Sequence, residues 1–170
     1  MVFGATTLLL GVLSHEGYRY FSDEDLSEGL SEVRWVRTLR TFVQNVFRYH
    51  LQKIYDILAH NYHDWDHPKD RQATGRGLVE LLGDGLFAAP VIELAQRHVA
   101  CNTAPTFLYS FARDRETAGN GSHGQGDELS SVFGAPLADG IDPFGSRFTT
   151  EEKRLSEVVM TYWVNFIRSG

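Results

Sequence analysis

Two places in this 170-residue chain carry side chains that could do acid–base chemistry. Glu16 comes directly after an apolar run that ends at Leu13, and His123 lies in the glycine-rich stretch GSHGQGDELSSVFGAPL, from Gly121 to Leu137. A histidine can act as a general base near neutral pH, whereas the amide of its neighbour Gln125 has no useful basicity. For Glu16 the alternative is a solvated acid in a surface loop. No Gly-x-Ser-x-Gly occurs in the chain to supply a serine nucleophile.

Two other patterns suggest a metal or a nucleotide, and neither is complete. His60, His63 and His67 crowd together with two aspartates, which superficially suits zinc. Pro68 and the Asp-Trp-Asp run before it instead indicate a turn that ends a helix. The glycines of residues 119–124 form a G-x-G-x-x-G, but no following strand carries the acid that would bind a ribose. The sequence therefore predicts no metal and no cofactor.

Glu16 must be positioned by the strand that precedes it. Thr6–Leu13 is a short continuous apolar run, typical of a central parallel strand that is covered on both faces. Thr106–Phe111 is a second such run, rich in aromatic residues. Helical segments lie between the two runs, so the strands are predicted to be parallel. Ligands and chemistry gather at the carboxyl ends of such strands, where Glu16 lies, and two strands alone make a poor sheet.

The other elements are predicted to be helices. A brief helix begins after the N-cap and first-turn acids of Ser22–Asp25, and a closing helix begins at the capping pair Thr149 and Glu152. The strongest periodic signal is one long helix over 33–58, where apolar residues recur at spacings of three and four. Two more helices are expected over 70–82 and 86–99, joined near residues 83–85. The fold class is therefore α/β, with few parallel strands and predominant helices.

Composition limits the function classes. With 42% hydrophobic residues, the chain can bury a sizeable core as one ordinary domain. The net charge is −6 and no Lys/Arg cluster occurs, so a nucleic-acid or anionic-membrane footprint is absent. The apolar N-terminal residues 1–13 are too few to span a bilayer. Cys101 is the only cysteine, so no internal disulfide forms.

Several short motifs occur in one order along nearly the whole chain and resemble the cholinesterase and type-B carboxylesterase family. The matching motifs are Gly11-Val-x-x-x-Glu16-Gly17, Tyr62-x-Asp64-Trp65, Asp84 to Pro90, Gly126-Asp-Glu-x-x-x-Phe133-Gly-x-Pro136 and Met160-Thr-Tyr-Trp163-x-Asn165-Phe166. The last of these is most similar to the neuroligin branch. The resemblance implies a partial α/β-hydrolase fold, in which residues 1–170 form the C-terminal third of a single domain.

The resemblance also implies where a Ser-Glu-His triad would lie. Glu16 matches the triad acid. Counted back without a gap from Phe133-Gly-Ala-Pro136, the triad histidine falls on Gln125, which cannot act as a base. His123 takes that place only if the loop bulges by two residues. The resemblance thus implies a catalytically inactive site; the alternative is part of an active carboxylesterase with Glu16 and His123 as acid and base.

Neuroligins resemble esterases in fold but act as adhesion receptors, so the resemblance implies a neurexin-like partner at the cell surface. It places the partner-binding residues just after the first strand, at Ser14, His15, Glu16, Tyr18 and Arg19. It also implies a homodimer through a helix from Pro90 to Val99, a location on the extracellular face of the plasma membrane, and membrane attachment only through segments outside these residues. Asn120-Gly-Ser122 is an N-glycosylation sequon, which applies only if the chain is extracellular. A free-standing α/β protein of unrelated role is the third hypothesis.

Overall fold

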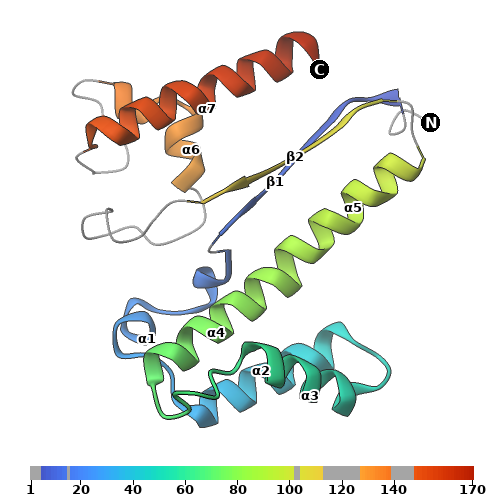
Figure 1. Cartoon of the computed structure of the whole chain (residues 1–170), viewed down its shortest axis with the longest axis vertical. Helices are drawn as coiled ribbons and strands as arrows, with labels where there is room; N and C mark the ends of the chain where they lie inside the picture. Colours follow the sequence, from blue (N-terminus) through green and yellow to red (C-terminus); the bar gives the residue numbers. More distant parts are fainter. Residues whose placement is uncertain (1–4, 15, 102–103, 113–126, 139–147) are drawn as a thin grey trace. The chain divides into compact units, whose positions relative to one another are not determined.

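The computed structural model describes residues 5–14, 16–101, 104–112, 127–138 and 148–170, and it is predominantly helical with two strands (Figure 1). The chain divides into two compact units. The strand unit comprises Met1–Ser14 and Val91–Gly170, and the helical unit comprises His15–Pro90. Each unit is built around elements that the sequence pattern predicts.

Strands β1 (Leu8–Leu13) and β2 (Thr106–Phe111) pair in the strand unit, and they are parallel as predicted. The register places Leu8 opposite Thr106 and Gly11 opposite Tyr109. The ring of Tyr109 covers Gly11 so closely that a Cβ there would lie 1.8 Å from a ring carbon. Gly11 is therefore required for this strand pair to form with Tyr109 on that face.

Helices on either side of β2 in the sequence pack against the sheet. The C-terminal helix α7 (Thr150–Ser169, red in Figure 1) contributes Trp163 and Phe166, whose rings contact the β2 residues Tyr109 and Phe107 at centroid distances of 5.0 and 6.0 Å. Thr149 and Glu152 form the predicted capping box at its start. These edge-to-face contacts between aromatic rings fasten α7 to the sheet.

His98 joins helix α5 (Ala89–Ala100) to the beginnings of both strands. Its side chain is buried, with Nδ1 2.7 Å from the hydroxyl of Thr106 and Nε2 3.1 Å from the carbonyl oxygen of Thr6. Because a carbonyl only accepts, Nε2 carries the proton, and in the neutral ring Nδ1 accepts from the Thr106 hydroxyl. His98 therefore lies in the core of this unit, on the face where the helical pattern places Val91 and Leu94.

The core of the helical unit lies between α2 (Glu32–Val46) and α4 (Arg71–Gly83). Its buried side chains are Leu30, Trp35, Leu39, Phe42, Val43, Leu78, Leu81 and Leu82. Ser31 and Asp70 cap the two helices by accepting hydrogen bonds from the backbone N–H groups of Arg34 and Gln72. The brief helix α1 (Asp23–Glu28) begins at Ser22 with a capping box, as predicted.

The single long helix predicted over 33–58 is wrong, because the structure breaks it into α2 and α3 (Leu51–Tyr62). Phe47 takes an extended conformation and packs its ring against Phe42 at 6.1 Å. His50 then adopts the left-handed region, with φ 57°. The apolar spacing continues through the break because both helices cover the same core, so periodicity alone does not reveal the turn.

The predicted joint near residues 83–85 is also different. Residues 84–88 form a π-helical turn, η3 (Asp84–Ala88), and α4, η3 and α5 follow one another without a gap. At its end the Ala89 N–H donates to the carbonyl oxygen of Asp84, five residues earlier. The wider turn shifts the hydrogen-bond ladder just before Pro90, which has no N–H to donate. The glycines that suggest a break are instead accommodated in the helix.

Candidate functional site

The predicted site around Glu16 begins at the carboxyl end of β1. Ser14 is exposed, and its N–H donates to the carbonyl oxygen of Phe111 at 3.1 Å. Glu16 then opens the 3₁₀ helix η2 (Glu16–Tyr20). Glu16 therefore lies just beyond the first strand, as the sequence predicts. The strand itself is not fully covered, because all six residues of β1 are only partly buried in this two-stranded sheet. His15 lies outside the described residues.

Gly17 fixes η2 to α4. A Cβ on Gly17 would lie 1.9 Å from the carbonyl oxygen of Val79, so only glycine permits this approach. Gly83, one turn further along α4, lies against the backbone of Glu16 and Gly17. Two glycines thus let the η2 turn rest directly on a helix, which makes it a well-supported surface element.

The outer side of η2 presents an arginine and aromatic rings. Arg19 is exposed, and its guanidinium carbon lies 5.8 Å from the ring centre of Tyr20 and 5.7 Å from that of Phe87. Tyr20 is 47% exposed, whereas Tyr18 is half-buried. Cation–π contacts of this kind order a long arginine side chain without a carboxylate partner. The sequence pattern predicts Tyr18 and Arg19 as site residues, but it does not predict Tyr20 and Phe87. The adjacent aromatic residues Tyr20 and Phe21 are the available signal for the first of these.

The two candidates for the triad base, Gln125 and His123, lie outside the described residues, as does the predicted glycosylation site Asn120. The chain is described again from α6 (Asp127–Val132), followed by Gly134 in the left-handed region with φ 73°. Ser156 of α7 is buried and donates to the carbonyl oxygen of Ser131 at 2.8 Å. The Phe-Gly-Ala-Pro end of the glycine-rich stretch is thus fastened to α7.

The histidine-rich turn after α3 is a packing cluster. The ring of His63 lies between Trp35 and Trp65, at centroid distances of 5.2 and 4.7 Å. The Asp64 carboxylate accepts the backbone N–H of His67, and this hydrogen bond lowers the pKa of Asp64. Across the described residues no group of three or more His, Cys, Asp or Glu side chains could hold a metal ion.

Tyr62 and Asp84 form a polar contact that the sequence does not predict. The Tyr62 hydroxyl donates to the carboxylate of Asp84 at 2.7 Å, which joins the end of α3 to the π-helical turn. Burial, followed by this hydrogen bond, raises the pKa of Tyr62 to about 12. Both residues belong to motifs that match the family, 22 positions apart, and their spacing alone carries no signal of contact.

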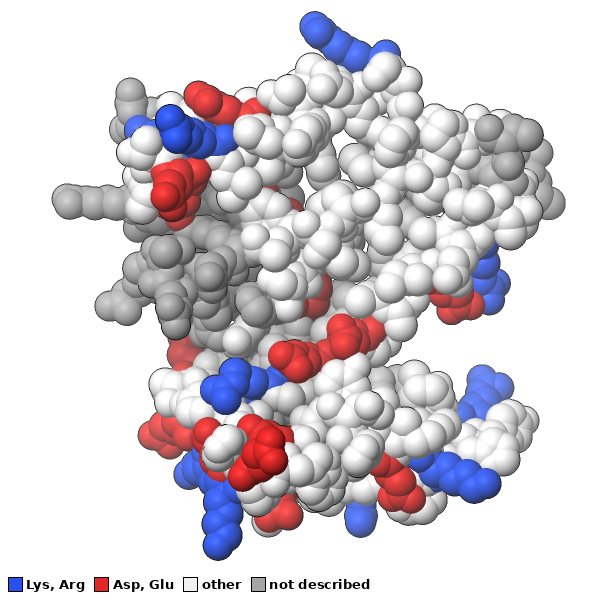
Figure 2. Space-filling model, in the orientation of Figure 1, with Lys and Arg blue, Asp and Glu red and all other residues white. Residues whose placement is uncertain are grey.

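Charged side chains are interspersed on the face drawn in Figure 2, with wide uncharged areas between them. Among the described residues, no helix combines the length and apolarity that crossing a bilayer requires. Of the predicted dimer helix, Ile92, Leu94 and Val99 are exposed in α5. Exposed apolar side chains such as those of Ile92 and Val99 are available for contact with other protein segments.

The family model and the individual proteins that are similar to this chain agree with one another. The model of the carboxylesterase family matches residues 4–170. The chain is 34% identical to Neuroligin-1 of Caenorhabditis elegans over 182 residues, covering 99% of this chain and 23% of that protein. It is 32% identical to human Neuroligin-2 and 30% identical to human Neuroligin-3, covering 96% of this chain and 20% of each. The chain therefore spans about a fifth of the length of these relatives.

Proposed function

Because this chain belongs to the carboxylesterase family, we propose that it forms part of a neuroligin-like adhesion protein on the cell surface, without esterase activity. The observation that carries the proposal is the 30–34% identity to neuroligins over nearly the whole chain. The proposal places the chain within a partial α/β-hydrolase domain on the extracellular face of the plasma membrane. Fold alone would not separate adhesion from hydrolysis, since one fold hosts many functions.

The lack of catalysis rests on the position that matches the triad histidine. Gln125 occupies it when the chain is counted without a gap, and an amide cannot remove a proton from a serine hydroxyl. Glu16 would then remain as the acid of a triad without its base. Its role becomes structural, at the start of a turn that Gly17 fastens to α4.

The proposed partner-binding face comprises Ser14, His15, Glu16, Tyr18 and Arg19, and its partner is a neurexin-like cell-surface protein. Its support is the exposed Arg19 side chain, ordered over the rings of Tyr20 and Phe87. Arginine and tyrosine are the residues most often found at energetic hot spots of interfaces. A helix-backed turn displays them with little loss of conformational entropy on binding.

We also propose that the protein forms a homodimer through the helix from Pro90 to Val99. Ile92 and Val99, seven residues apart, form an exposed apolar stripe on one face of α5, and such a stripe commonly marks an interface. A symmetric dimer would pair the same stripe of two protomers.

The experiment that tests the adhesion proposal measures binding of the natural full-length protein to an immobilised neurexin-like ectodomain. The double variant Tyr18→Ala with Arg19→Ala should weaken binding by at least ~2 kcal/mol, the scale of a hot spot, while the protein stays folded. Arg48→Ala, an exposed arginine between α2 and α3, is the matched control and should leave affinity unchanged. Unchanged affinity in a folded double variant would remove this face from the proposal.

A further inference from the structure

The helical unit contains a groove that the proposed function does not use. It has a volume of about 410 Å³. Its lining residues are Tyr20, Phe21, Arg34, Arg37, Thr38, Thr41, Phe42, Asn45, Val46, Leu82 and Leu86. The α2 residues from Arg34 to Asn45 follow one side of that helix for about three turns, or roughly 16 Å. About five residues of extended peptide would span that length.

The groove has an apolar floor. Phe42 and Leu82 are buried core residues, and Phe21 and Leu86 are partly buried side chains packed against the same core. Tyr20 stands at the rim, 47% exposed. Such a floor offers an apolar side chain of a partner a surface to pack against.

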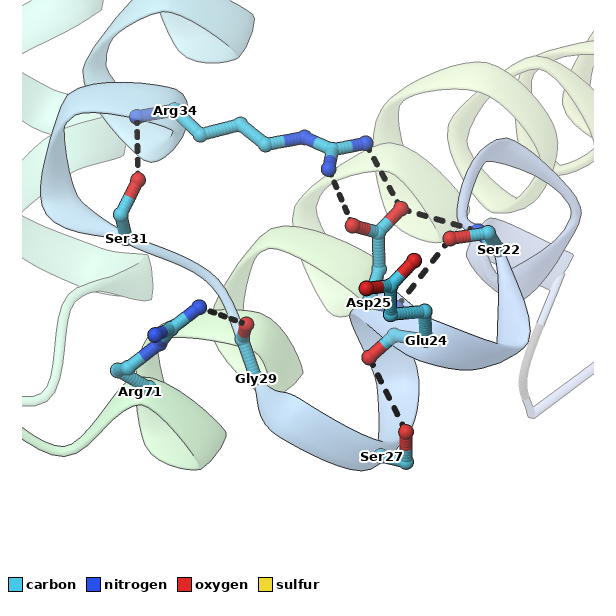
Figure 3. Close-up of polar contacts among 8 residues, drawn as sticks. All are labelled: Ser22, Glu24, Asp25, Ser27, Gly29, Ser31, Arg34 and Arg71. Atoms are coloured by element: carbon cyan, nitrogen blue, oxygen red, sulfur yellow. Dashed lines mark hydrogen bonds and ion pairs between the residues drawn. The ribbon is translucent and has the colours of Figure 1, made fainter.

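The wall formed by α2 is basic. Arg34 and Arg37 line it, and none of the described residues that line the groove is acidic, although the chain as a whole has a net charge of −6. Both guanidinium NH2 groups of Arg34 donate to the carboxylate of Asp25, one of them at 2.8 Å to Oδ2, so its charge is neutralised and its side chain held in place (Figure 3). Asp25 is itself held by the Ser22 N–H, at 3.0 Å.

Arg37 therefore carries the uncompensated charge of the groove. It is exposed, and its guanidinium makes no ion pair or hydrogen bond with the described residues. Its backbone carbonyl accepts the Thr41 hydroxyl at 2.9 Å. An exposed guanidinium that has no carboxylate partner among the described residues, next to an apolar floor, complements a carboxylate next to an apolar side chain.

We propose that this groove binds an acidic peptide segment of a partner protein, with a carboxylate on Arg37 and a neighbouring apolar side chain on the Phe42, Leu82 and Leu86 floor. An extended segment suits the groove because alternate side chains of a strand point to opposite faces, so carboxylates and apolar groups can separate. The inference stands apart from the proposed function, because Arg37, Phe42, Leu82 and Leu86 do not belong to the proposed partner-binding face.

The test uses the natural full-length protein and a fluorescein-labelled peptide of alternating glutamate and leucine. Fluorescence anisotropy should show binding that weakens as salt is raised, because Arg37 is exposed. Arg37→Glu should weaken binding by about tenfold or more, the worth of one charge-assisted hydrogen bond. Arg48→Glu has the same charge change outside the groove and should bind as the wild type does. Circular dichroism of each variant checks that it is folded.

Three results would overturn the inference. The first is absence of binding, or binding that Arg37→Glu and Arg48→Glu reduce equally. The second is equal affinity for a peptide of alternating lysine and leucine, which would mean that the floor alone binds. The third is self-association of the wild type that Arg37→Glu abolishes, because the occupant would then be a second copy of this protein. Neurexin binding is measured separately, so failure of either proposal leaves the other standing.

Discussion

Alanine substitution at two glycines of α4 should change the free energy of unfolding in opposite directions. Gly75 and Gly77 are both helical, so alanine at either position gains about 1 kcal/mol of helix propensity. At Gly75 the nearest atom to a new Cβ is the Leu30 backbone nitrogen at 3.7 Å, an ordinary contact. At Gly77 the new Cβ would lie 2.0 Å from the carbonyl oxygen of Tyr62. Only the second substitution forces two helices apart.

The magnitudes follow from these contacts. Gly75→Ala should raise the free energy of unfolding by up to about 1 kcal/mol, because the methyl group fits. Gly77→Ala has the same gain in propensity, but overpacking costs about 1–3 kcal/mol, and the upper end applies because a backbone atom must move. We expect a net loss of about 1–2 kcal/mol. The two variants should therefore differ by roughly 2–3 kcal/mol.

Urea unfolding of the natural full-length protein measures this difference as a shift in midpoint at constant slope. A second readout is the pKa of the Tyr62 hydroxyl. It should fall from about 12 toward its ordinary value in Gly77→Ala, because displacing α3 reduces the burial of Tyr62 and disturbs its hydrogen bond to Asp84. Equal stability of the two variants, or a Gly77→Ala protein more stable than the wild type, would refute the close approach of α3 and α4.

Two further predictions concern pH. The pKa of Tyr62 is raised to about 12, so the native state holds this proton more tightly than the unfolded chain does. The stability that this proton contributes is complete below pH 10 and is lost as pH rises through 12. Tyr62→Phe should remove this loss of stability at alkaline pH, as measured by unfolding curves over a series of pH values. The pKa of Asp25 is lowered, chiefly by the Ser22 N–H, so its contribution is present above the unfolded pKa of 3.8 and is lost as pH falls through the lower folded pKa. Asp25→Asn should flatten the acid side of the stability profile; an unchanged profile would mean that the capping box does not hold this carboxylate.

Local signals in the sequence predict most elements of the fold. Both strands, their parallel pairing and the capped beginnings of α1 and α7 follow from apolar runs and N-cap residues. The break at His50 does not, because the apolar spacing passes through it unchanged and the left-handed conformation has no glycine or asparagine to mark it. The π-helical turn is hidden for the opposite reason, since its glycines suggest a break where the helix continues.

The candidate site is predicted only in part. The position of Glu16 can be predicted from the apolar strand before it. The contact between Arg19 and Phe87 cannot, because the two residues are 68 positions apart in the sequence. The groove along α2 is also a product of packing between segments distant in the sequence. Arg34 and Arg37 resemble any other basic residues on a solvated helix face until Phe42 and Leu82 are seen beside them.

The central claim is that this family member does not hydrolyse esters. Its most direct test is the release of p-nitrophenol from p-nitrophenyl acetate by the natural full-length protein. We predict a rate equal to the buffer background, because Gln125 matches the triad histidine in the proposed count without a gap, and an amide cannot act as the base. Turnover above background that Glu16→Gln and His123→Ala each abolish, and that Gln125→Ala leaves untouched, would contradict the account and establish a working triad.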